Sequence, residues 1–178
     1  SAQDALTAAT PLDGIKTGLS QMRTLQEMQP QFDWQAMPVW PWLNVACLLG
    51  GLCLLWRRII GWQIPLSFLA TVFVIAAAFH LVDSDRYASP LMHWFSGATM
   101  LCAFFIATDP VSAPTTSLGR IWFGIGVAFW LMMIRYFGGY PDAVAFAVLI
   151  MNMATPLLEH YTQPRAYGHQ ESSHDAID

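Results

Sequence analysis

Charged side chains are scarce in this sequence. They make up 11% of its 178 residues, whereas about 25% is usual for a soluble domain. No charged residue lies in the stretches 34–56, 59–82 and 87–108. Uncharged, mostly apolar runs of about 20 residues are long enough to cross the hydrocarbon core of a bilayer as helices. A soluble protein of this size could not cover all of them, so we predict an integral membrane protein.

Cysteine and clusters of basic residues are also lacking. The three cysteines, Cys47, Cys53 and Cys102, lie within apolar runs, and the nearest two are six residues apart. That spacing places them on different faces of a helix, so we expect core or lipid-facing side chains and neither a disulfide nor a metal site. The net charge is −4 and there is no basic patch, which argues against a nucleic-acid partner. We assign no catalytic residues.

Five apolar segments are predicted to span the membrane: 39–56, 64–82, 91–108, 121–137 and 142–161. Tryptophans stand at both ends of the first segment, where the membrane interface would lie. Pro65 opens the second, at a position where a helix tolerates proline. The region 39–161 is therefore predicted to be a five-helix transmembrane domain, and the fold class is an all-α integral membrane protein.

The two ends of the chain are polar. Residues 1–38 form an arm in which apolar residues recur every three or four positions over 12–28, which predicts a short amphipathic helix on the membrane surface. The tail, residues 162–178, has the composition of a disordered segment. Five spans would place the arm and the tail on opposite sides of the membrane.

Basic residues indicate the orientation, because cytoplasmic loops carry an excess of Lys and Arg close to the spans. With the arm outside, four arginines lie on the inner side: Arg57, Arg58, Arg120 and Arg165. The outer side then carries Arg86 and Arg135 near the spans. The sequence therefore favours a periplasmic arm and a cytoplasmic tail.

Two similar stretches end in Ala-Thr: "DALTAAT" at 4–10 in the arm and "HWFSGAT" at 93–99 in the third span. In a continuous third helix, the Thr99 hydroxyl would bond to a carbonyl one turn back. Gly97 and Ala98 would let a neighbouring helix approach closely. We therefore interpret Thr99 as structural.

Thr10 has a different setting. It lies in the polar arm, and Pro11 directly after it favours an extended backbone, which leaves the hydroxyl open to a modifying enzyme. The alternative is that Thr7 or Thr10 caps the amphipathic helix that follows. The residues alone leave both readings open and favour the cap.

A resemblance favours modification. "DALTAAT" resembles the motif read by periplasmic flavin transferases, in which Asp, two residues, Ser or Thr, a small residue and Ala precede a final Ser or Thr. The resemblance implies that Thr10 carries FMN as a phosphoester and that three other positions are recognised: Asp4, Thr7 and Ala9. His93 replaces the Asp in the second stretch, so Thr99 lacks the motif's carboxylate.

A wider resemblance covers essentially the whole chain. The stretches 103–120 and 135–169, with "ATPLD" in the arm, resemble the D subunit of the Rnf electron transport complex and its homologue, the B subunit of the sodium-pumping NADH:quinone reductase. This chain is similar to the C-terminal half of those proteins, whose halves are inverted repeats in a urea-transporter-like fold. The resemblance implies a bacterial inner-membrane subunit of a ferredoxin:NAD oxidoreductase that moves Na⁺ or H⁺. It also implies covalent FMN, partner subunits and a flavin transferase.

Polar residues inside the spans are few. No Asp, Glu, Lys or Arg is expected mid-span, where such groups usually mark proton routes. Four other polar residues are expected to make interhelical hydrogen bonds: Asn44, His80, Asn152 and Thr155. Asp109 and Asp142, beside prolines at helix ends, are expected to cap helices, with a role on an ion route as the alternative.

A rival function comes from another class of protein. The chain would then be half of a non-redox membrane channel or transporter, with Thr10 unmodified. A covalent flavin distinguishes the two hypotheses.

Overall fold

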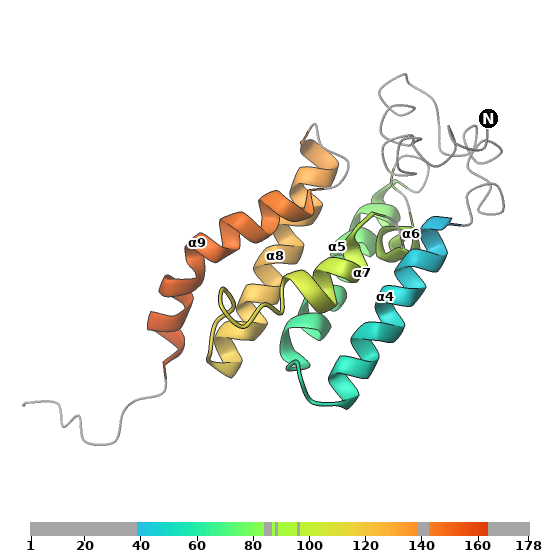
Figure 1. Ribbon diagram of the computed structural model, residues 1–178. Coiled ribbons are helices and arrows are strands. Elements are labelled where there is room, and N and C mark those ends of the chain that lie inside the picture. Colours follow the sequence, from blue (N-terminus) through green and yellow to red (C-terminus); the bar gives the residue numbers. More distant parts are fainter. Residues whose placement is uncertain (1–38, 84–86, 88, 96, 139–142, 164–178) are drawn as a thin grey trace, which may run out of the picture.

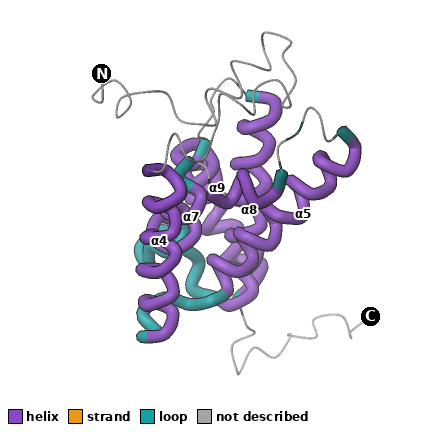
Figure 2. The backbone as a smooth tube through the Cα atoms, turned by 90° about the vertical axis from the view of Figure 1, so that its right-hand side faces the viewer, coloured by secondary structure: helices purple, strands orange, loops and turns teal. Residues whose placement is uncertain are grey.

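The computed structural model describes residues 39–83, 87, 89–95, 97–138 and 143–163. Within these ranges the chain is helical, with turns and short loops between helices and no strand (Figure 2). The arm 1–38 and the tail from 164 onward lie outside the described residues, so the amphipathic helix and the disordered tail stay predictions. Thr162 and Gln163, assigned to the tail, instead complete and cap the last helix.

Four long helices match predicted spans. They are α4 (Val39–Trp56), α5 (Gln63–Val82), α8 (Ser117–Phe137) and α9 (Val144–Thr162). Helix α8 starts at 117 where the sequence predicted 121. The reason is a cap: the Thr116 hydroxyl accepts a hydrogen bond from the Gly119 backbone N at 3.1 Å, which satisfies one free donor of the first turn.

The long helices have the length and composition of membrane spans. Helices α5, α8 and α9 are long and apolar enough to cross a bilayer, and the part of α4 with described side chains, Trp42–Trp56, is a shorter apolar helix. Large apolar side chains such as Leu81, Met153 and Trp56 point outward. A surface of this kind is stable when lipid covers it. The chain is an all-α, multi-pass membrane protein.

The third predicted span is not one helix. It consists of α6 (Pro90–Phe95), α7 (Thr99–Leu101) and the π-helical turn η1 (Cys102–Ile106). Gly97, between α6 and α7, has a φ of 63°, a left-handed conformation that ends a right-handed helix and that glycine adopts without steric cost. The predicted continuous helix over 91–108 is therefore wrong at this point. We call this broken element the third segment.

The helices pack in an order that puts the third segment next to α4. Helix α8 packs against α5 on one side and α9 on the other, while α4 contacts α6, α7 and η1 (Figure 1). The centre of the core lies between α5 and α8, where Phe68, Phe123 and Leu131 are fully buried. The start of α4 and the end of α9 lie at opposite ends of the bundle (Figure 1).

Gly124 permits the close approach of α8 to α5. A Cβ there would overlap the Ser67 hydroxyl and lie 2.9 Å from the Ile64 carbonyl oxygen. We expect Gly124→Ala to cost about 1–3 kcal/mol by overpacking. The measurement is the thermal midpoint of the purified protein in detergent.

Gly50→Ala is the matched control. Its nearest neighbour would be the end of the Phe105 ring at 3.3 Å, which can tilt away. Both substitutions raise helix propensity equally, so the difference between them isolates the contact. Equal midpoints for the two variants would contradict the packing described here.

Candidate functional site

The predicted flavin-attachment residues lie outside the described residues. Asp4, Thr7, Ala9 and Thr10 all belong to the arm, and Asp142 lies in a later gap. Their roles therefore stay predictions. The described residues offer two other clusters of polar side chains, one at each end of the third segment.

The first cluster surrounds the break between α6 and α7, and Arg135 is its centre. Sequence reasoning placed Arg135 at the outer side of the membrane, but it is buried on α8, with a relative exposure of 5%. Its Nη2 donates to the Thr99 hydroxyl at 2.9 Å, and its Nη1 donates to the His93 carbonyl at 3.3 Å. A buried guanidinium therefore lies within the helical bundle, in the last turn of α8 and not at the middle of the span.

Thr99 is structural, as predicted, but by a different bond. Its hydroxyl donates to the His93 carbonyl, six residues back, at 2.8 Å. A carbonyl at that separation comes within reach only because the helix is broken at Gly97. The Thr99 hydroxyl oxygen also accepts a hydrogen bond from Arg135, so Thr99 joins the end of α6 to α8.

The break needs these donors. The last carbonyls of a helix have no partner within it, and hydrocarbon supplies none. Asn44 on α4 supplies a donor to a second carbonyl at the end of α6: its Nδ2 donates to the Phe95 carbonyl at 3.0 Å. This confirms the predicted interhelical bond of Asn44. Side chains of α4, α7 and α8 together satisfy the end of α6.

Aromatic rings enclose the arginine cluster. The Tyr136 hydroxyl and His93 Nε2 share a hydrogen bond of 3.3 Å, and Tyr136 packs against Phe79 and Tyr87 with ring centroids 4.6 and 5.2 Å away. His93 Nδ1 is buried and has no hydrogen-bond partner among the residues that the structure describes. Because Arg135 is buried, its hydrogen bonds lie in a region of lower polarity than water, where they are stronger.

Arg135 could have been found from periodicity. Ala128, Leu131 and Met132 are buried residues of α8, and Arg135 follows them at the spacing of one helix face. The count of basic residues places it on the outer side of the membrane and gives no sign that it is buried. Position along a helix face was the better signal.

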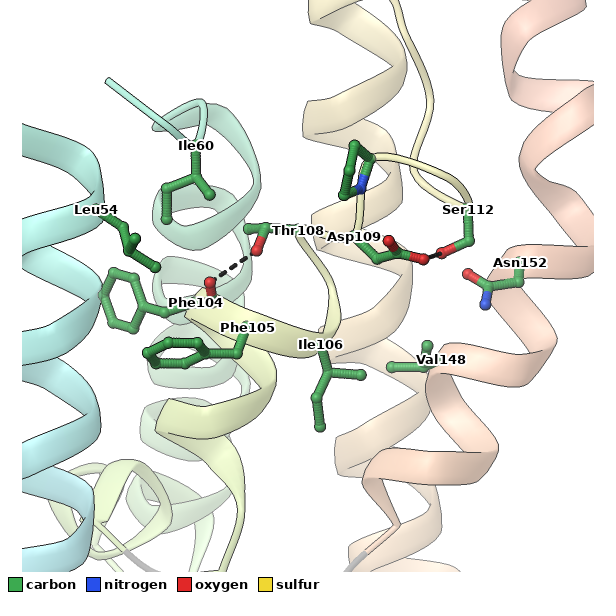
Figure 3. Close-up of a pocket in the computed structure, with 11 residues that line it drawn as sticks. Leu54, Ile60, Phe104, Phe105, Ile106, Thr108, Asp109, Ser112, Val148 and Asn152 are labelled. Carbon is green, nitrogen blue, oxygen red and sulfur yellow. Dashed lines mark hydrogen bonds between the residues drawn. The ribbon is translucent and has the colours of Figure 1, made fainter. Parts of the chain in front are cut away.

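The second cluster lies where the third segment ends, around a pocket of about 470 Å³ (Figure 3). Phe104 and Phe105 form apolar walls, and the polar lining is Thr108, Asp109, Ser112 and Asn152. Asp109 Oδ2 accepts from the Ser112 hydroxyl at 3.0 Å, and Oδ1 accepts from the Val111 backbone N at 3.3 Å. These bonds fix the carboxylate at the pocket, but they lie within a turn, so the helix cap expected of Asp109 is not formed.

A second pocket of about 380 Å³ lies beside the first. The two share Ile106, Val148 and Asn152, so they form one groove between the third segment and α9. The Asn152 side-chain oxygen is buried and has no hydrogen-bond partner among the described residues, so its predicted interhelical bond is not made there. We call this feature the Asp109 groove.

The remaining predicted polar residues bond to loops. His80 Nδ1 donates to the Tyr87 carbonyl at 2.8 Å, just beyond its own helix. The Thr155 hydroxyl donates to the Ser112 carbonyl at 3.1 Å and thereby ties α9 to the loop that follows η1. Thr155 therefore supports the wall of the Asp109 groove.

The side chains that line the Asp109 groove are of the kinds that bind a small cation weakly. Carboxylate, amide and hydroxyl oxygens are the ligands that hard cations prefer. Within the described ranges no group of three or more His, Cys, Asp or Glu residues is placed to hold a metal ion. One carboxylate with neutral oxygens suits weak binding better than a permanent metal centre.

The fold and these clusters define a class: a multi-pass helical membrane protein with a broken segment and polar groups at both of its ends. Comparison with known sequences identifies the family. A profile of the NQR2, RnfD, RnfE family matches residues 1–168, so the chain belongs to this family.

Individual relatives agree with the family match. The chain is 54% identical to the D subunit of the ion-translocating oxidoreductase complex of Sodalis glossinidius, over 94% of this chain and 48% of the relative. It is 52% identical to the protein of the same name from Aliivibrio salmonicida, again over 94% and 48%. The Shewanella denitrificans protein is 49% identical over 96% and 49%. The chain thus spans about half the length of these curated relatives.

Asn44 and Asn152 allow a paired test of the hydrogen bond at the break. We expect Asn44→Leu to lower stability by about 1–3 kcal/mol, because the buried Phe95 carbonyl loses its donor. Asn152→Leu removes an oxygen that has no partner among the described residues, so its cost should be smaller. Thermal midpoints in detergent measure both, and a larger loss for Asn152→Leu would contradict the assignment.

Proposed function

We propose that this chain is the C-terminal half of the D subunit of an ion-translocating ferredoxin:NAD oxidoreductase of the Rnf type. It carries FMN on Thr10 as an electron relay coupled to movement of Na⁺ or H⁺. The observation that carries the proposal is the family match, which covers the arm motif and the membrane domain together. The printed name of the relatives supports the same reading.

The proposal includes a location and partners. The membrane is the bacterial inner membrane, with the arm in the periplasm and the tail in the cytoplasm. The cluster of Arg57 and Arg58 between α4 and α5 supports this orientation. The partners are the other subunits of the complex, and a periplasmic flavin transferase that acts on the arm.

The attachment chemistry needs only the hydroxyl of Thr10. Its oxygen forms a bond to the FMN phosphorus of FAD, the pyrophosphate bond breaks, AMP leaves, and the hydroxyl proton is released. Asp4, Thr7 and Ala9 are the residues that the transferase recognises. Once attached, the flavin supplies one- and two-electron chemistry, while the protein positions it and tunes its potential.

Ion movement is assigned to the Asp109 groove. It lies where a broken membrane segment ends, which is where inverted-repeat transporters place their substrate and ion sites. It combines a fixed carboxylate with the buried oxygen of Asn152. Phe104 and Phe105 form apolar walls beside these groups.

Covalent flavin at Thr10 is tested by co-expression with a periplasmic flavin transferase. After denaturing electrophoresis, the wild-type band should fluoresce under ultraviolet light, and intact-mass measurement should show the added FMN. Thr10→Ala should abolish both signals, whereas Thr10→Ser, which keeps a hydroxyl, should retain them. Asp4→Asn should reduce the flavin content by weakening recognition.

Thr17→Ala is the matched control, because Thr17 lies in the arm outside the motif. Flavin that survives Thr10→Ala but is lost in Thr99→Ala would overturn the site. A wild-type protein that carries no flavin would instead favour the non-redox channel or transporter.

The ion assignment is tested by Asp109→Asn in the whole complex, reconstituted in sealed vesicles. Loss of the charge should raise the ion concentration for half-maximal uptake about tenfold, since interactions with a charged group are stronger than with a neutral one. Asp83→Asn, at the far end of α5, should leave it unchanged. Equal behaviour of both variants would remove Asp109 from the route.

A further inference from the structure

The break in the third segment is held by buried side chains that come from different helices. Asn44, Thr99 and Arg135 have relative exposures of 1%, 0% and 5%. Each donates a hydrogen bond to a backbone carbonyl near the end of α6. The break is thus a fixed feature of the bundle, built by α4 and α8 as well as by the segment itself.

Arg135, like Thr99, connects the two sides of the break, and it does so from a different helix, α8. Nη1 donates to the carbonyl of His93, before Gly97, and Nη2 donates to the hydroxyl of Thr99, after it. A guanidinium is planar, so its two nitrogens stand at a fixed separation. The Arg135 side chain therefore sets the position of Thr99 relative to α6.

The chain beyond Thr99 has little freedom to absorb a shift. Cys102 N bonds to the Ala98 carbonyl at 2.8 Å, Ala107 N bonds to the Cys102 carbonyl at 2.9 Å, and the Thr108 hydroxyl bonds to the Phe104 carbonyl at 2.7 Å. The Phe104 side chain also lies against α4, where a Cβ on Gly51 would overlap its ring. Continuous hydrogen bonds thus connect the break to the residue before Asp109.

We propose that Arg135 is a positioning residue for ion passage. Through Thr99 it fixes the third segment along the bundle, and so it fixes the depth and shape of the Asp109 groove. Ala98, next to the break, and Ile106, near the end of the segment, both line that groove, so a shift of the segment would move two of its walls. This inference rests on the proposed function, and the transported ion is the same small cation.

Arg120 provides a matched control. It is the other arginine of α8, near the opposite end of the helix, and its Nε donates to the Pro114 carbonyl at 3.0 Å. It does not line either pocket of the groove. Arg120→Gln removes the same charge and the same kind of bond without touching the break.

The experiment uses the whole complex in sealed vesicles, with Na⁺ and H⁺ tested separately as the cation. Two quantities are measured per mole of covalent flavin: the rate of electron transfer, and the cation concentration for half-maximal uptake. Arg135→Gln and Thr99→Val should raise the half-maximal concentration about tenfold, while electron transfer to the flavin stays within about twofold. The double variant should equal either single variant, because both remove one coupled unit.

Conservative variants separate positioning from folding. Thr99→Ser keeps the hydroxyl and should retain the wild-type half-maximal concentration, and Arg135→Lys, which supplies one donor group, should fall between Arg135→Gln and wild type. If Arg135 variants fail to assemble, the Thr99→Val and Thr99→Ser pair decides. A fall of both measured quantities in equal proportion, or the same effect from Arg120→Gln, would overturn the inference.

The outcome also distinguishes this inference from the proposed function. A wild-type complex without cation-dependent uptake, or one in which Asp109→Asn has no effect, contradicts the proposed function. A complex in which Asp109→Asn acts as expected while Thr99→Val leaves the half-maximal concentration unchanged contradicts only the role of Arg135.

Discussion

A backbone inside a bilayer must find its hydrogen-bond partners within the protein, because hydrocarbon offers none. Four of the crossings meet this constraint as continuous helices. The third segment does not, since Gly97 turns the chain with a φ of 63° and leaves the carbonyls at the end of α6 without helical donors. Asn44, Thr99 and Arg135 supply those donors. The positions of α4 and α8 against this segment follow from that requirement.

The same segment connects two sites of opposite character. At its start, a buried cation donates hydrogen bonds to a backbone carbonyl and a hydroxyl, beside the packed rings of His93 and Tyr136. At its end, a carboxylate lies beside hydroxyl and amide oxygens in an open groove. The π-helical turn between them, Cys102–Ile106, is a form of helix that occurs often at functional sites. The third segment therefore connects the arginine cluster at its start to the Asp109 groove at its end.

Much of the fold could be predicted from the sequence because membrane spans are set by length and charge. Helices α4, α5 and α9 begin and end within two residues of the predicted bounds. The break could not be predicted, because Gly97 stands in an apolar run where close helix packing explains a small residue equally well. Of the two candidate sites, Asp109 was recognised beside its proline, whereas Arg135 was assigned to the membrane surface. The covalent-flavin motif lies in the arm, where the described residues do not reach.

The order of the partners along the chain has a consequence for biogenesis. His93 and Thr99, which accept the hydrogen bonds of Arg135, both precede it in the sequence. A ribosome that makes the chain from its amino end therefore delivers the acceptors to the membrane before the guanidinium emerges. Helix α8 can then insert with its arginine near the lipid headgroups and pack against the segment that already carries these acceptors. The order of synthesis thus allows burial of the charge to follow the assembly of α4, α5 and the third segment.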